Sequence, residues 1–143
     1  MTHIDFHVNA PVKLAYACRL ARKGYGSGRP MVFYARDPVL DTFDRLLWTF
    51  SDVDFIPHCR VRDRLADVTP ILLAGPDDAE ACRHHDVIVN LDREQPEFFS
   101  RFERMIEVVE AADEDLEAGR ARWKFYKDRG YPLNRHDLAP SAA

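Results

Sequence analysis

The residues with the clearest capacity for binding chemistry lie late in the chain, between Gly119 and Tyr131. This segment is basic, although the whole chain has a formal net charge of −4. Its charged side chains give a local charge of +4 (five cations minus one anion): Arg120, Arg122, Lys124, Lys127, Asp128 and Arg129. Trp123, Phe125 and Tyr126 lie among them. Guanidinium and ammonium groups bind carboxylates through charge-assisted hydrogen bonds, and an indole ring offers apolar surface. The segment therefore predicts a site for a ligand that is both anionic and apolar.

Helical spacing would bring part of this segment onto one surface. Arg120, Trp123, Lys124 and Lys127 are placed at i, i+3, i+4 and i+7, which are neighbouring positions on a helix. A structural interpretation competes with this one. Acidic residues crowd the start of the same helix and basic residues its end, which complements the helix dipole by about 0.3–1 kcal/mol per favourable charge. The residues alone do not choose between a binding surface and a packed helix.

A second candidate site combines acidic residues with a histidine. Asp52 and Asp54 flank one residue, and His58 follows the apolar run 55–57 at a predicted strand end, where α/β enzymes often place catalytic groups. This constellation gives the alternative hypothesis of a small enzyme of nucleotide or nucleic-acid metabolism. Surface acids and a hydrogen-bonded structural histidine are the commoner explanation of the same pattern, so no catalytic residue is assigned.

Two further motifs are rejected. Cys82-x-His84-His85 offers metal-ligating groups, but no second cluster stands at zinc-site spacing. The glycines of 24–28 follow a predicted helix and precede a strand, whereas a phosphate loop follows a strand and opens a helix. The segment is therefore interpreted as a helix-to-strand turn. We predict neither a metal nor a cofactor.

Composition places the chain among soluble globular proteins. Its 143 residues suit one domain with its own core, and a pI near 5.8 argues against a broad nucleic-acid-binding face. We expect no membrane span and no signal peptide. Three widely spaced cysteines, Cys18, Cys59 and Cys82, are typical of a reduced compartment, so a cytoplasmic location is expected.

Apolar runs and turn residues predict strands that alternate with helices. Strands are expected at 4–8, 31–34, 55–57, 71–73 and 87–91, and helices at 12–23 and 39–48. A helix is expected from Pro96, because Phe98, Phe102, Met105 and Val109 would share one face. A last helix is expected from a capping Asp113 to Arg129, with Gly130 at its end.

This alternation predicts an α/β fold with a mainly parallel sheet. The expected architecture is a single Rossmann-like three-layer domain over residues 1–143, ending in two packed helices. Its ordered core is expected to span about 3–133, followed by a short tail.

Several ordered blocks resemble the chi subunit of bacterial DNA polymerase III holoenzyme. These blocks are Leu46-Leu47-Trp48, Phe55-Ile56-Pro57-His58, the 87–90 strand leading to Phe98-Phe99 and Phe102, and the run from Arg120 to Leu133. They span nearly the whole chain in the same order. The resemblance implies a Rossmann-like accessory subunit that is not an enzyme as an isolated chain.

The resemblance also implies partners. Chi proteins link the clamp-loader complex, through a psi subunit, to single-stranded DNA-binding protein. The latter is bound through its acidic C-terminal tail, which ends in an apolar Pro-Phe and a free carboxylate. DNA would then be reached only indirectly.

Carried onto this sequence, the resemblance places the tail-binding residues on Arg120, Trp123 and Lys124. Arg120 would meet the terminal carboxylate and Lys124 the acidic side chains. Lys127 would extend the same face, and Val109 would form an apolar wall. Trp123 stands where a tyrosine is common, and Leu116 stands where some members are basic.

The psi-facing surface would include Phe55, beside Trp48. Core packing is the competing interpretation for both aromatic residues, since large aromatics serve either a core or an interface.

Overall fold

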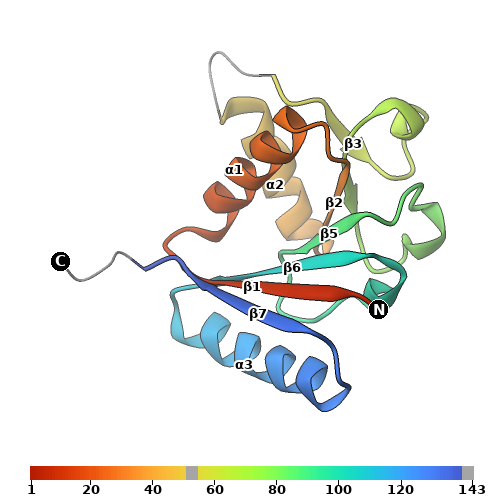
Figure 1. Ribbon diagram of the computed structural model, residues 1–143. Helices are drawn as coiled ribbons and strands as arrows, with labels where there is room; N and C mark the ends of the chain where they lie inside the picture. The colour runs from red at the N-terminus through yellow and green to blue at the C-terminus, as the bar shows by residue number, and fades with distance from the viewer. Residues whose placement is uncertain (51–54, 140–143) are drawn as a thin grey trace.

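The computed structural model describes residues 1–50 and 55–139. In this part of the chain, the frame is a seven-stranded parallel sheet ordered β3-β4-β2-β5-β6-β1-β7 (Figure 1). The strands are β1 (His3–Ala10), β2 (Met31–Tyr34), β3 (His58–Arg60), β4 (Ile71–Ala74), β5 (Val87–Asn90), β6 (Arg104–Glu110) and β7 (Leu133–Asp137). The helices are α1 (Lys13–Gly26), α2 (Asp37–Thr49) and α3 (Asp113–Asp128). The predicted α/β, Rossmann-like fold is confirmed.

The sheet separates two layers. Helices α1 and α2 cover one face, and α3 covers the other beneath β6, β1 and β7 (Figure 1). Short 3-10 turns, η1 (Ala66–Val68), η2 (Ala79–Ala81) and η3 (Phe99–Arg101), belong to the α3 side. Two buried clusters match this division, one around Phe33 and Phe43 and the other around Phe6 and Tyr126. The central strands β2, β4 and β5 are buried along their whole length, as expected for strands covered on both faces.

The helix predicted from Pro96 through Val109 is wrong. This stretch contains η3 and then β6, so the chain does not end in two packed helices. Its apolar residues fit helical spacing, but β6 lies between β5 and β1 and is covered on both faces, so apolar residues occupy consecutive positions on either side of the buried Glu107. Ile106, Val108 and Val109 are β-branched and favour a strand.

The last helix is confirmed as α3, with one correction at its start. Ala112 rather than Asp113 occupies the capping position, and no side chain caps the helix. Gly130 ends it with a positive φ of 80°, and the amide of Tyr131 donates to the carbonyl of Tyr126 at 3.1 Å. The chain then forms β7 along the edge of β1, beyond the predicted ordered core, to Asp137.

Another strand lies later than predicted. The run 55–57 precedes β3, which begins at His58 and pairs with β4. Pro57 has no amide proton to donate to a strand ladder, so pairing starts after it. The turn predicted at 24–28 is confirmed only in part: α1 continues through Gly26, three residues beyond its predicted end, and the turn lies at 27–28, where Gly28 has a φ of 71° before β2. Within residues 1–50 and 55–139, none of the helices has the length and hydropathy that a membrane span requires.

Candidate functional site

A buried polar network fixes how α3 lies on the sheet. Glu107 on β6 is fully buried, and its Oε1 accepts hydrogen bonds from Arg122 Nε (3.0 Å) and Asn90 Nδ2 (2.9 Å). Its Oε2 accepts from the hydroxyl of Tyr126 at 2.6 Å. Burial, followed by the charge of Glu107, raises the pKa of Tyr126 well above its usual range. The hydroxyl therefore stays protonated and remains a donor.

Arg122 therefore does not contribute to the surface charge expected of this segment. It is only 2% exposed, and it also donates from Nη1 to the carbonyl of Arg93 at 2.6 Å. One of the five cations counted in the basic segment is an internal ion-pair partner of Glu107. The pair orients α3 so that Arg120, Lys124 and Lys127 are exposed, on the side away from Glu107.

Helix α3 and strand β6 approach each other closely at Gly119. Gly119 on α3 is buried against Val109 on β6. A Cβ added at Gly119 would lie 2.9 Å from Val109 Cγ2 and 3.0 Å from Cγ1, closer than real contacts allow. Glycine at this position lets the helix backbone approach the strand.

A groove of about 560 Å³ opens beside this contact, between α3 and the strands β1, β6 and β7. Its lining comprises Phe6, Val8, Asn9, Val109, Leu116, Gly119, Arg120, Trp123 and Arg135. The half-buried Trp123 packs edge-on against Phe6, with ring centroids 5.1 Å apart. The predicted residues Val109, Arg120 and Trp123 are therefore brought together in one concavity. Its volume lies in the range typical of ligand sites.

Two arginines stand at the rim of this groove. Arg120 is exposed, and no carboxylate of the described residues lies within ion-pairing distance of it. Arg135, on β7, has Asp137 as its partner at 3.6 Å, and both side chains are largely exposed. The groove thus combines an apolar, aromatic floor with guanidinium donors, which suits a carboxylate attached to an apolar group.

Lys124 and Lys127 lie outside the lining. Lys124 Nζ pairs with Asp128 Oδ2 at 3.1 Å across one helical turn, and its side chain is 78% exposed. Such exposed pairs contribute little stability and exchange readily with other anions. The two lysines therefore extend the positive surface along α3 without forming part of the groove.

The sequence did not indicate Phe6, Val8, Asn9 or Arg135 as site residues. Phe6 and Val8 were expected only as strand residues, and their alternation with His7 already placed them on one sheet face. Arg135 was missed because β7 is an exposed edge strand with a polar sequence, LNRHD, and an exposed pattern.

The second predicted site is an exposed aromatic pair. Trp48, in the last turn of α2, is 53% exposed, and Phe55 is 63% exposed. Their ring centroids lie 5.4 Å apart, and the Trp48 ring lies 4.5 Å from the ring of His58. Core packing does not account for either residue.

Comparisons with known proteins match this architecture along most of the chain. The family model described as DNA polymerase III chi subunit, HolC, matches residues 1–134. The DNA polymerase III subunit chi of Pseudomonas aeruginosa is 32% identical, over 96% of this chain and 98% of the relative. The chain belongs to the chi-subunit family of DNA polymerase III.

More distant relatives carry the same name. The DNA polymerase III subunit chi of Escherichia coli is 24% identical, over 82% of this chain and 80% of the relative. That of Haemophilus influenzae is 25% identical, over 85% of each chain. As a chi-family member, the chain is an accessory subunit of the replicative polymerase and is not an enzyme on its own.

The alternative enzyme site receives no support from this chi-family structure. Asp52 and Asp54 lie outside the described residues. His58 is buried, with Nδ1 2.7 Å from the carbonyl oxygen of Ile56 and Nε2 2.9 Å from Asp44 Oδ1. These contacts identify it as a structural histidine beneath Trp48. In the described ranges, Cys82, His84 and His85 belong to no group of side chains able to hold a metal ion.

The carboxyl edge of the sheet, where α/β proteins often bind ligands, carries internal ion pairs in this chi-family chain. Lys13 Nζ pairs with Asp115 Oδ2 at 2.8 Å, and both side chains are buried. Arg36 donates from Nε and Nη2 to Asp92 at 3.0 and 2.9 Å, which holds the pKa of the Asp92 carboxyl below its usual value despite burial. Lys13 and Arg36 are therefore already matched by carboxylates of the same chain.

Proposed function

We propose that this chi-family chain is an adaptor that binds the acidic C-terminal tail of single-stranded DNA-binding protein in the α3 groove. The observation that carries the proposal is the placement of Arg120 and Arg135 around the Trp123–Phe6 floor. A peptide that ends in an aromatic residue presents a carboxylate and an apolar ring within one residue. The groove offers matching groups for both.

Each side chain has a separate role in this proposal. Arg120 and Arg135 would donate to the terminal carboxylate, while the terminal ring would pack against Trp123 and Val109. Lys124 and Lys127 would attract the acidic residues that precede the terminus. Because Lys124 is highly exposed, its contribution would be screened by salt, whereas the ring contact would not.

The second half of the proposal concerns Trp48 and Phe55. We propose that this exposed pair docks a psi-type subunit and thereby joins the chain to the clamp-loader complex. Exposed stacked aromatics are the residue type enriched at interface hot spots. The ring of His58, fixed by the Ile56 carbonyl and Asp44, supports Trp48 from below.

Titration calorimetry tests the tail site directly. The full chain is titrated with a peptide copying the acidic tail, and with the same peptide lacking its final phenylalanine. Binding of the full peptide that disappears on truncation supports the proposal. Binding that is indifferent to truncation would show that the apolar floor is not used.

Substitutions then test which residues bind the tail peptide. Arg120→Ala should weaken binding by about tenfold to a hundredfold, because a charge-assisted hydrogen bond contributes about 1.5–3 kcal/mol. Lys124→Glu should weaken binding mainly at low salt. Arg64→Glu, an exposed change in the β3–β4 connection, is the control and should leave affinity unchanged. If Arg120→Ala and Lys124→Glu also leave affinity unchanged, the assignment of the groove is wrong.

Co-elution with a psi-type subunit tests the aromatic pair. Trp48→Ala and Phe55→Ala should each abolish co-elution while leaving tail binding intact. Retention of the complex by both variants would exclude this surface as the psi interface.

A further inference from the structure

The amino-terminal quarter of this acidic chain has an uneven charge distribution. Between Asp5 and Asp37 the sequence contains no Asp or Glu. Over the same stretch it contains the basic residues Lys13, Arg19, Arg22, Lys23, Arg29 and Arg36. A cationic stretch of this length in a chain of net charge −4 concentrates positive potential on one part of the molecule, around α1.

Part of this charge remains available at the surface. Lys13 and Arg36 are engaged by Asp115 and Asp92 at the carboxyl edge of the sheet. Arg19, Lys23 and Arg29 are exposed, and no carboxylate of the described residues lies within ion-pairing distance of them. These three side chains lie on α1 and on the loop that follows it, on the sheet face opposite α3 (Figure 1).

Of these cations, Lys23 and Arg29 line a pair of adjoining cavities that share residues and form one groove, and Arg19 lies outside the lining. The first, of about 330 Å³, has Lys23, Arg29, Arg104 and His7 in its walls and Met31 and Ile106 in its floor. Its lining includes no acidic residue among those described. The second, of about 540 Å³, shares Arg29 and Arg104 and extends along the amino ends of the strands. We call the two together the α1 groove.

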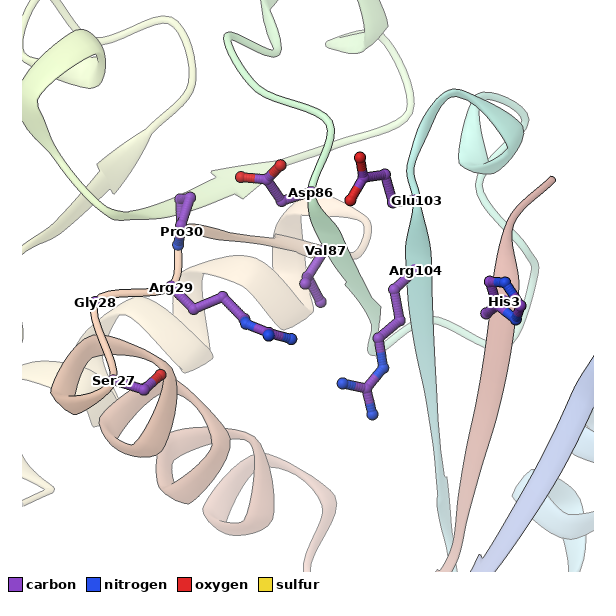
Figure 2. A pocket seen from close by; sticks show the side chains of 9 residues that line it. All are labelled: His3, Ser27, Gly28, Arg29, Pro30, Asp86, Val87, Glu103 and Arg104. Carbon is purple, nitrogen blue, oxygen red and sulfur yellow. The ribbon is translucent and has the colours of Figure 1, made fainter.

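Figure 2 shows how the two arginines are placed at the junction of the cavities. Arg29 reaches from the loop after α1 towards Val87, and Arg104 projects from β6 into the same space. The carboxylates of Asp86 and Glu103 lie at the far end of the groove and point away from both guanidinium groups. Arg104 is also paired with Asp5, at 2.6 Å, so Lys23 and Arg29 supply the uncompensated charge.

Ring side chains continue the groove onto the sheet. His7 on β1 accepts or donates a hydrogen bond at 2.6 Å with the hydroxyl of Tyr16, and its ring lies 5.0 Å from that of the exposed His136 on β7. Burial, and then the neighbouring His136, lowers the pKa of His7 to about 4, so its ring is neutral near pH 7. Cations on α1 therefore stand beside uncharged rings on an open part of the sheet.

We propose that the α1 groove binds the phosphate backbone of single-stranded nucleic acid. Sequence-independent single-strand sites combine a positively charged groove with ring side chains on which bases stack. Arg19 and Lys23 lie on α1 and Arg29 on the loop that follows it, and His7, Tyr16 and His136 lie on the adjacent sheet and helix surface. An acidic peptide is the competing occupant, but a backbone with one charge at every residue fits a row of cations better. This direct contact goes beyond the proposed indirect link to DNA through a partner whose tail this chain binds.

Fluorescence anisotropy with a labelled oligothymidylate and the full chain tests the proposal. With about three phosphate contacts, a plot of log affinity against log salt concentration should have a slope of about −2. The double variant Lys23→Glu/Arg29→Glu should bind at least about tenfold more weakly and show a shallower slope. The matched control, Arg64→Glu/Arg83→Glu, changes the net charge equally at exposed positions away from the groove and should bind like the unmodified chain.

Three outcomes would overturn the proposal. The first is no binding by the unmodified chain at low salt, and the second is an equal loss in both double variants, which would indicate bulk charge alone. The third is that the groove variant loses binding of an acidic peptide but keeps oligothymidylate, which would assign the groove to a peptide. Lys23→Gln/Arg29→Gln repeats the test without reversing charge, and circular dichroism melting checks that each variant is folded.

The α3 groove and the α1 groove can be tested independently of each other. Trp123→Ala should leave oligothymidylate binding unchanged, and Lys23→Glu/Arg29→Glu should leave tail-peptide binding unchanged. Failure of the tail proposal would therefore not affect the nucleic-acid result, and failure of the latter would not affect the former.

Discussion

The two tryptophans of this chain stand in opposite surroundings. Trp123 is half-buried, packs edge-on against Phe6 and forms the floor of a groove bordered by arginines. Trp48 is 53% exposed and stacks with Phe55, which is itself 63% exposed. A concave, charged setting suits a short anionic peptide end. An exposed apolar pair suits a broad contact in which a partner removes the rings from water.

The support beneath each tryptophan differs as well. The helix that carries Trp123 is tied to the sheet by the buried carboxylate of Glu107. Trp48 lies at the end of α2, and the described rings beside it are those of His58 and Phe55. We therefore expect the α3 groove to depend strongly on internal residues, and the Trp48–Phe55 pair to depend on few.

The largest expected effect comes from breaking the support of α3. Glu107→Ala leaves the buried guanidinium of Arg122 unpaired, which should lower the free energy of unfolding by about 3–5 kcal/mol. Urea denaturation measures this change. Asp128→Ala, which removes the exposed partner of Lys124, is the control and should cost about 0.5 kcal/mol or less. Similar losses in the two variants would contradict the anchoring role of Glu107.

Replacing each tryptophan by alanine tests how much each ring contributes to the free energy of unfolding. Trp123→Ala should lower the free energy of unfolding by about 2 kcal/mol, since it loses part of its burial and the contact with Phe6. Trp48→Ala should change it by about 0.5 kcal/mol or less, because the ring is largely exposed. Thermal melting of both variants gives the difference. Equal losses would mean that Trp48 is as much a core residue as Trp123.

A smaller effect is expected at Gly119. Gly119→Ala forces Val109 away from α3, and overpacking of about 1–3 kcal/mol outweighs the gain in helix propensity of about 1 kcal/mol. We expect a net loss near 1 kcal/mol in urea denaturation, with weaker tail binding. Gly26→Ala is the matched control, because a Cβ there meets nothing within 4 Å. Unchanged stability and tail binding in Gly119→Ala would show that the helix can move away from β6.

The last expected effect concerns pH on the opposite sheet face. The pKa of His7 is about 4 in the folded chain, against about 6.5 when unfolded. The unfolded chain therefore binds the extra proton between these values, and stability falls as pH drops from 6.5 towards 4. His7→Gln should lose less stability over that window, measured by denaturation at pH 7, 6 and 5. Identical pH dependence in the two proteins would exclude a contribution from His7.

The fold was largely predictable because most elements carry a local signal. Short apolar runs gave β2, β4 and β5, and Gly130 marked the end of α3. The strand β6 was mistaken for a helix because burial on both faces removes the alternation that identifies a strand. Met105 and Val109 are apolar and four residues apart. This spacing fits one face of a helix, and it also fits a strand that is buried on both faces.

The site was predictable only on its helical side. Arg120, Trp123 and Lys124 share a face through local spacing, which a sequence displays. Arg122 looked equivalent to them, but its carboxylate partner is on β6, fifteen residues away in sequence. Arg135 could not be placed without knowing that β7 pairs with β1, a contact that depends on the whole topology.

The pairing of β7 with β1 has a consequence for the order of events during synthesis. Phe6 and Arg135 are register partners on adjacent strands, and both line the α3 groove. Neighbouring parts of the groove lining are therefore supplied by strands far apart in the sequence, β1 well before α3 and β7 after it. The groove is complete only after α3 and β7 have been synthesised and β7 has paired with β1, so a growing chain lacks this surface until its sheet has closed.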